Sequence, residues 1–170
     1  NLALEISKSD YICRLDVHSK YPKNYLVALY EKIEGDSVYA CVGGSWNIES
    51  FSDDIVSTSI AKASSSKFAV GSIPYKNHDK KIQGILEVDN VPYGFYRKEV
   101  FDEIGGFDED LVRNQDNEFY SRMQKAGLRI GLIPNVEITY FARPTLRALF
   151  KNYYGYGLFT PLVDYKVGSI

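Results

Sequence analysis

Two residues with metal-binding side chains, Asp16 and His18, come directly after the apolar run 11–15. Side chains two residues apart project from the same side of a strand, so this carboxylate and imidazole can converge on one ion, with Arg14 on that side as well. A carboxylate with an imidazole suits Mn²⁺ better than Mg²⁺, which prefers oxygen ligands. By residue type alone a polar turn, with Asp16 capping the next loop and His18 solvated, is the simpler interpretation.

A second acidic cluster, residues 114–118, stands before an apolar-periodic stretch. An acid at the start of a helix normally caps it or interacts with its dipole. The functional alternative is a general base that takes a proton from a reacting hydroxyl. Asp116 and Glu118 are two positions apart and do not share a helical face, so we expect only one of them to face a reacting group.

The elements that must position these residues alternate along the chain between apolar runs and helical periodicity. This alternation predicts an α/β layer fold with a mixed, mostly parallel sheet flanked by helices, and such folds place ligand sites at the carboxyl ends of strands. The expected strands are 11–15, 38–42, 91–97, 129–133 and 136–140, the last two separated by Pro134-Asn135. The expected helices are the end of one in 1–8, then 22–35, 52–63, a short one before Gly105-Gly106, 117–125 and 145–154, with a long loop from 64 to 82 that contains a solvated His78.

The composition of the 170-residue chain narrows the class of protein. Hydrophobic residues make up 45% of the chain and charged residues 25%, which allows one packed domain. The net charge is −2 without a basic block, so we expect no nucleic-acid partner. The two cysteines, Cys13 and Cys41, are predicted to be free and buried in strands. The sequence holds no apolar run long enough to span a bilayer.

Five motifs follow one another in an order that resembles family-2 glycosyltransferases with the GT-A fold, in particular those of bacterial exopolysaccharide and succinoglycan biosynthesis. The likeness covers residues 1 to about 157. The motifs are Arg14-Leu15-Asp16-Val17-His18-Ser19, Val91-Pro92-Tyr93-Gly94-Phe95-Tyr96-Arg97, Ile104-Gly105-Gly106-Phe107-Asp108-Glu109, Asn114-Gln115-Asp116-Asn117-Glu118-Phe119, and Arg122.

The resemblance implies roles for these residues. Asp16 and His18 occupy the place of the family's Asp-x-Asp motif, which binds Mn²⁺ or Mg²⁺ and the nucleotide diphosphate. Asp116 matches the catalytic base, and Gln115 stands where the family has another acid. Glu118 is expected to hold the acceptor or orient Asp116. The remaining substrate-binding positions are Arg14, Tyr93, Gly94, Gly105, Gly106, Gln115 and Arg143, of which Gly105 and Gly106 form the acceptor-side turn.

Three further expectations stand beside the same resemblance. Tyr140 and Phe141 stand where many relatives have a histidine ligand before an Arg-Pro pair, so no third protein ligand is expected there. The rings of Trp46 and Tyr93 are able to stack on sugars, although core packing is the simpler role for such residues. The chain, 1–170, is expected to be a single catalytic-domain fragment that lacks the first, nucleotide-binding βαβ units and is inactive alone.

The function that the resemblance predicts is inverting transfer of a sugar from a nucleotide-diphosphate sugar, with a UDP-sugar as the commonest donor. The acceptor is a carbohydrate or a lipid-linked saccharide in cell-surface polysaccharide synthesis, and the parent protein is expected in the cytoplasm, at the inner face of the membrane. An alternative from another class is a non-catalytic carbohydrate-binding or assembly module that keeps the fold. The substitutions represented by His18 and Gln115 keep this alternative open.

Overall fold

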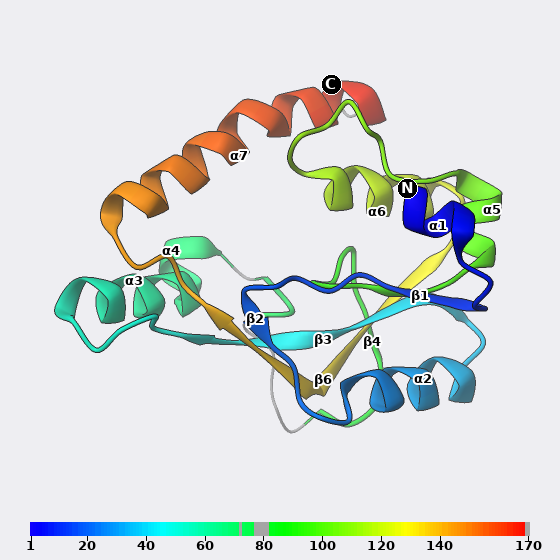
Figure 1. Cartoon of the computed structure of the whole chain (residues 1–170), viewed down its shortest axis with the longest axis horizontal. Helices are drawn as coiled ribbons and strands as arrows, with labels where there is room; N and C mark the ends of the chain where they lie inside the picture. Colours follow the sequence, from blue (N-terminus) through cyan, green and yellow to red (C-terminus); the bar gives the residue numbers. More distant parts are fainter. Residues whose placement is uncertain (72, 77–81, 169–170) are drawn as a thin grey trace.

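The centre of the fold is a pair of long parallel strands, β3 (Tyr39–Glu49) and β6 (Arg129–Phe141). The computed structural model of the chain describes residues 1–71, 73–76 and 82–168, and no side chain at position 70 (Figure 1). His78, expected in a solvated loop, lies outside the described residues. Within them the sheet has the strand order β1-β5-β3-β6-β2, with β4 (Leu86–Glu87) also paired to β6.

The sheet is mixed, as predicted, but its parallel character is confined to the long pair β3–β6. The pairings of β1 (Tyr11–Cys13) with β5 (Phe95–Arg97), β3 with β5, and β6 with both β2 (Ser19–Lys20) and β4 are antiparallel. Alternation of strands and helices predicts parallel pairing only where a helical crossover returns the chain in the same direction. The short strands β1, β2, β4 and β5 pair without such a crossover, and their pairings are antiparallel.

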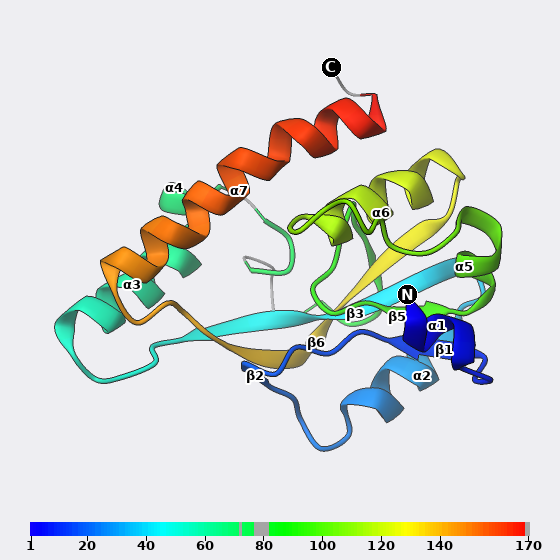
Figure 2. The ribbon, with the colours of Figure 1, turned by 45° about the horizontal axis from the view of Figure 1, so that its top comes forward.

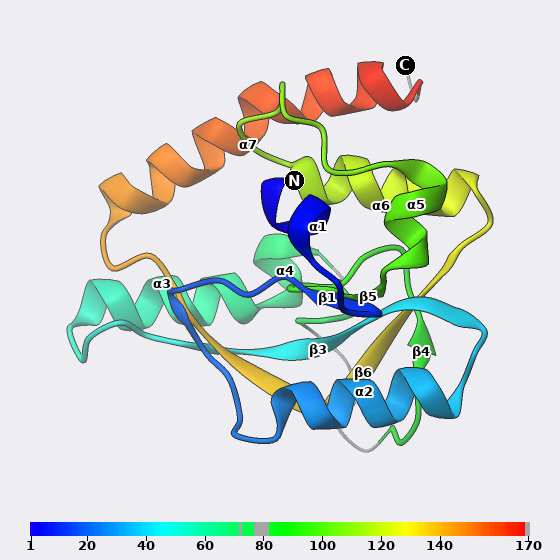
Figure 3. The ribbon, with the colours of Figure 1, turned by 45° about the vertical axis from the view of Figure 1, so that its right-hand side comes forward.

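Helices cover both faces of this sheet. In Figures 1 and 3, α2 (Tyr25–Gly35) lies along one face, and α5 (Glu99–Ile104), α6 (Gln115–Lys125) and α7 (Leu146–Val167) lie on the other. At one end of the sheet, α3 (Ile55–Ser65) and α4 (Lys67–Val70) pack together, while α1 (Leu2–Ile6) lies near α5. The long helix α7 bridges the molecule, contacting α3 with its beginning and α6 further along (Figure 2).

Helix boundaries follow local signals that the sequence carries. Asp54 caps α3 as predicted, since its Oδ1 accepts hydrogen bonds from the backbone N–H groups of Val56 (2.9 Å) and Ser57 (3.0 Å). Helix α5 ends at Gly105, whose φ of 81° lies in the left-handed region that favours glycine. These two residues therefore fix the start of α3 and the end of α5.

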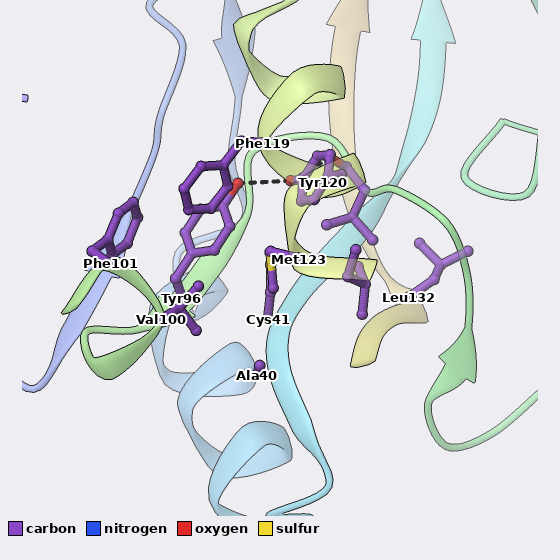
Figure 4. Close-up of a cluster of buried hydrophobic side chains, with 11 residues drawn as sticks. Ala40, Cys41, Tyr96, Val100, Phe101, Phe119, Tyr120, Met123 and Leu132 are labelled. Carbon is purple, nitrogen blue, oxygen red and sulfur yellow. Dashed lines mark hydrogen bonds between the residues drawn. The ribbon is translucent and has the colours of Figure 1, made fainter. Parts of the chain in front are cut away.

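In the core between the sheet and α6, two buried tyrosine hydroxyl groups are joined by a hydrogen bond. Tyr96 donates to Tyr120 (2.8 Å), which in turn donates to the backbone carbonyl of Val91 (2.8 Å), and both rings are fully covered (Figure 4). Gly94 makes this possible because a Cβ at that position would lie 2.4 Å from the Tyr96 hydroxyl and 2.7 Å from that of Tyr120. The close approach expected at Gly94 is therefore to two buried tyrosines.

Several element boundaries differ from the sequence prediction: β3, expected over 38–42, runs to Glu49, β5, expected over 91–97, is Phe95–Arg97, and α4 lies within the expected loop 64–82. The expected strands 129–133 and 136–140 are one strand, β6, because a register shift opposite Gly44/Ser45 absorbs the Pro134 step and Ser45 Oγ donates to the Pro134 carbonyl (2.9 Å). Helix α7, expected to end near residue 154, continues to Val167 through Pro161. The buried Val163 and Val167 pack with Leu111 and hold this extension in place.

Candidate functional site

A cleft of about 380 Å³ brings together segments that are far apart in the sequence. Its walls come from the turn after β1, the strand β3, the segment before β5, the start of α6, and the first half of α7. The sequence-predicted residues that line it are Arg14, Asp16, His18, Tyr93, Gly94, Gln115, Asp116 and Arg143. Their shared location supports the predicted site, while their chemical roles stay predictions.

Asp16 and His18 lie side by side in this cleft. His18 Nδ1 is 2.6 Å from Asp16 Oδ1, and both side chains are about two-fifths exposed (40% and 36%). The expected strand 11–15 is wrong at its end, because β1 stops at Cys13 and the pair lies in the turn that leads to β2. The turn is fixed by Tyr21, whose hydroxyl accepts from the Asp16 backbone N–H (2.7 Å).

Arg14 links this turn to the second acidic cluster. Its Nη1 lies 4.0 Å from Asp116 Oδ2, and its guanidinium lies over the ring of Phe107. Asp116 is in the first turn of α6 with about half of its side chain exposed, and its Oδ1 accepts from the backbone N–H of Asn117 (3.0 Å). The Asp16–His18 pair and the Asp116 carboxylate at the start of α6 therefore share one cleft, and the Arg14 guanidinium lies beside Asp116.

Cations outnumber carboxylates in the cleft. Besides Arg14, it is lined by Lys76, Arg113 and Arg143, against the two carboxylates already described. The buried side chain of Asn152 on α7 accepts from Arg113 Nη1 (3.2 Å) and Arg143 Nη2 (3.4 Å), so one amide oxygen holds both guanidinium groups. Sequence reasoning missed Arg113, since its only local signal is its position just before the acidic cluster.

Glu118, expected to hold the acceptor or orient Asp116, does not line the cleft, and neither does the glycine pair 105–106, expected to form the acceptor-side turn. Glu118 is buried and binds Arg122 through both carboxylate oxygens (2.6 and 2.8 Å). Arg122 then donates to the backbone carbonyls of Ile104 (2.5 Å) and Gly106 (2.7 Å). This placement favours a positioning role, in which Glu118 fixes the turn after α5 through Arg122.

Aromatic side chains form the rest of the cleft wall. Trp46 stacks on Tyr140, with ring centroids 4.2 Å apart and planes 7° apart, and Lys76 Nζ lies 5.4 Å from the Trp46 ring centroid. These groups cover the Trp46 ring, which agrees with packing more than with stacking on a sugar. Burial lowers the pKa of Lys76 and raises that of Tyr93, whose hydroxyl lies 2.7 Å from Ser19 Oγ.

The donor atoms of the Asp16–His18 pair fit a divalent ion that takes only two protein ligands. The pair offers carboxylate oxygen and imidazole nitrogen from adjacent positions, the donor set expected for Mn²⁺. Among the residues that the structure describes, no group of three or more His, Cys, Asp or Glu side chains is arranged to hold a metal ion. Further ligands have to come from substrate and water, as is usual for ions bound with phosphates.

The sheet and its flanking helices make this a mixed α/β protein, and the relation to the succinoglycan biosynthesis protein ExoA indicates that its fold is GT-A-like. No protein-family model matches the chain. Over 151 residues the chain is 30% identical to the succinoglycan biosynthesis protein ExoA of Rhizobium meliloti (strain 1021). The aligned region is 88% of the chain and 43% of that protein, so the chain spans less than half the length of this relative. The resemblance predicted from the order of the motifs is thereby confirmed.

None of the described helices is both long enough and apolar enough to cross a membrane. Both cysteines are free, as predicted: Cys41 is buried in β3, and Cys13 in β1 is partly buried. Burial raises the pKa of the Cys13 thiol to about 12 and that of Cys41 as well, so neither thiol has the low pKa of a nucleophile.

Proposed function

We propose that the chain is the metal-binding and acceptor-side part of an inverting glycosyltransferase, which transfers a sugar from a nucleotide-diphosphate sugar to a saccharide or lipid-linked saccharide in cell-surface polysaccharide synthesis. One observation supports this most directly. The Asp16–His18 turn and Asp116 are 100 positions apart in the chain, yet they line one cleft in which arginines outnumber acids. The relation to ExoA supports polysaccharide synthesis as the setting.

In this proposal Asp116 is the general base. A sugar hydroxyl is a poor nucleophile, and a carboxylate that accepts its proton during attack on the anomeric carbon removes this difficulty. The side chain of Asp116 is half exposed to the cleft, so a hydroxyl can reach it. Attack from the side opposite the departing diphosphate inverts the configuration at that carbon.

The cationic residues stabilise the departing group. A nucleoside diphosphate gathers negative charge as its bond to the sugar breaks, and Arg143 and Arg113, held together by Asn152, are positioned to neutralise that charge. Asp16 and His18 are the residues that would hold Mn²⁺ or Mg²⁺ here. When bound, such an ion supplies Lewis-acid stabilisation of the diphosphate.

Replacing Asp116 by Asn in the parent protein tests the base, because residues 1–170 are expected to be inactive alone. The substitution keeps the shape and removes the proton acceptor, so kcat for sugar transfer should fall by about a hundredfold to ten-thousandfold with the fold intact. Asp102→Asn on the exposed face of α5, outside the cleft, is the matched control and should transfer normally. Radiolabelled nucleotide sugars with saccharide and lipid-linked acceptors provide the assay.

Unchanged transfer by Asp116→Asn refutes the assignment of the base. A different outcome addresses the non-catalytic alternative: saccharide binding by the wild-type parent protein without transfer from any nucleotide sugar would identify a carbohydrate-binding module. The metal is tested separately, because Asp16→Asn and His18→Ala should each weaken Mn²⁺ binding measured by calorimetry.

A further inference from the structure

Two buried side-chain atoms, Trp46 Nε1 and Asn114 Oδ1, lack a hydrogen-bond partner among the described residues. Both residues line the same cleft. Folded proteins pair the large majority of their buried polar atoms, because leaving one unpaired destabilises the fold. The location of both exceptions in the cleft indicates that a ligand supplies the missing partners.

Asn114 is held so that its free atom is an acceptor. It is 6% exposed, and its Nδ2 donates to Thr160 Oγ1 on α7 (3.1 Å). The Thr160 hydroxyl has one proton, which it donates to the backbone carbonyl of Tyr156 (2.8 Å). Thr160 can therefore only accept from Asn114, so the amide NH₂ must face Thr160 and the oxygen is left without a donor.

The backbone at this position is also strained. Asn114 has a φ of 60°, in the left-handed region, and the other described non-glycine residue with a positive φ is Tyr93, with 52°. Both line the cleft. Such conformations persist where the surrounding structure enforces them, and they cluster at ligand sites.

Trp46 presents the complementary group. An indole N–H can donate and cannot accept. The ring is fixed by its stack on Tyr140, by the edge of Tyr75 at 5.1 Å, and by a hydrogen bond from its backbone N–H to the Tyr75 carbonyl (2.7 Å). Both free atoms are covered by neighbouring side chains, so a ligand reaches them by displacing part of that cover.

A ligand that satisfies both atoms must accept one hydrogen bond and donate another. Phosphate oxygens and carboxylates accept from Trp46 but have no proton for Asn114, whereas an ammonium group can only donate. Water, amide groups and hydroxyl groups do both, and of these the saccharide of the proposed function carries several hydroxyl groups. We propose that Trp46 and Asn114 bind hydroxyl groups of the saccharide substrate, one accepting from Trp46 Nε1 and one donating to Asn114 Oδ1. This inference rests on the proposed function and adds two specificity-determining residues to it.

The single tryptophan of the chain makes a direct test available, because its indole N–H gives one identifiable resonance in a ¹H–¹⁵N spectrum. The probes are methyl glycosides of glucose, galactose and mannose, and the corresponding deoxy sugars. We expect at least one glycoside to move the indole resonance downfield as its N–H becomes hydrogen-bonded. The matching deoxy sugar should bind about three- to tenfold more weakly, the effect of one hydrogen bond.

Substitutions separate ligand binding from packing. Trp46→Phe keeps the ring on Tyr140 and removes the N–H, and Asn114→Gly keeps the left-handed backbone and removes the amide. Each should weaken glycoside binding about three- to tenfold and abolish discrimination against one deoxy sugar. Thr160→Ser keeps the hydroxyl that accepts from Asn114 and removes only a methyl group, so it is the matched control and should bind glycosides as the wild type does.

Three results overturn the inference. The first is a shift of cleft residues by a glycoside that leaves the indole resonance in place. The second is a loss of binding in Thr160→Ser equal to that in Asn114→Gly, and the third is that no glycoside binds. Pyrophosphate with Mg²⁺ is titrated in parallel to separate this failure from that of the proposed function. If pyrophosphate shifts the resonances of Arg143 and His18 while no glycoside has an effect, the inference is refuted and the proposed function stands. If neither probe shifts any resonance, both the inference and the proposed function are refuted.

Discussion

The Glu118–Arg122 pair offers the sharpest test of how the cleft is held together. Replacing Glu118 by Ala removes two charge-assisted hydrogen bonds, of 2.6 and 2.8 Å, from a buried carboxylate. Such bonds contribute about 1.5–3 kcal/mol each. Arg122 is 28% exposed and keeps its two backbone acceptors, so water recovers part of this loss. We expect the free energy of unfolding to fall by about 3 kcal/mol, within the range for breaking a buried ion pair.

Urea unfolding followed by circular dichroism measures this change. A chain of this size should lose about 6–12 °C in Tm for that difference. Glu103→Ala on the exposed face of α5 is the control and should stay within about 0.5 kcal/mol of the wild type. A double-mutant cycle with Arg122→Ala then isolates the interaction between the two side chains.

Two outcomes would refute this reasoning. Additive effects of the two substitutions would show that the ion pair contributes nothing to stability. Loss of sugar transfer by Glu118→Ala with unchanged unfolding would show that Glu118 acts on the substrate, as the resemblance first implied. The expected result instead is a stability loss shared with Arg122, because both residues fix the turn at Gly106.

Three further predictions concern packing, thiols and pH. Gly94→Ala should destabilise the fold by about 1–3 kcal/mol in urea unfolding, because the new methyl group collides with the hydroxyls of Tyr96 and Tyr120; an unchanged midpoint would show that the core yields freely. At about pH 8 only about one in ten thousand Cys13 side chains is a thiolate, given a pKa of about 12, so Ellman's reagent should label the native protein far more slowly than the protein in guanidinium chloride. The Lys166 ammonium lowers the pKa of Asp108, and Asp108 raises the pKa of Lys166, so this ion pair stabilises the fold between the two pKa values. Lys166→Met should therefore lower Tm at neutral pH, and this difference from the wild type should vanish as pH falls through the lowered pKa of Asp108. A Tm difference that does not depend on pH would contradict this.

Much of the secondary structure could be predicted because its causes are local. The Asp54 cap and the stop of α5 at Gly105 are specified within one helical turn. Two of the places where an element continues beyond its expected end, at Pro134 and Pro161, carry a residue that normally ends an element. There the long β3–β6 pairing and the packing of Val163 with Leu111 outweighed the local signal.

For the site, the sequence by itself determined which residue types are available and the order of the motifs, and from that order the kinship with a succinoglycan biosynthesis protein. Only the tertiary structure decided which residues share a cleft. In the structure Asn152 accepts hydrogen bonds from both Arg113 and Arg143, and Glu118 is buried and binds Arg122. The physical reason is that a side chain's partner depends on contacts between distant segments, which residue types and spacing along the chain do not specify.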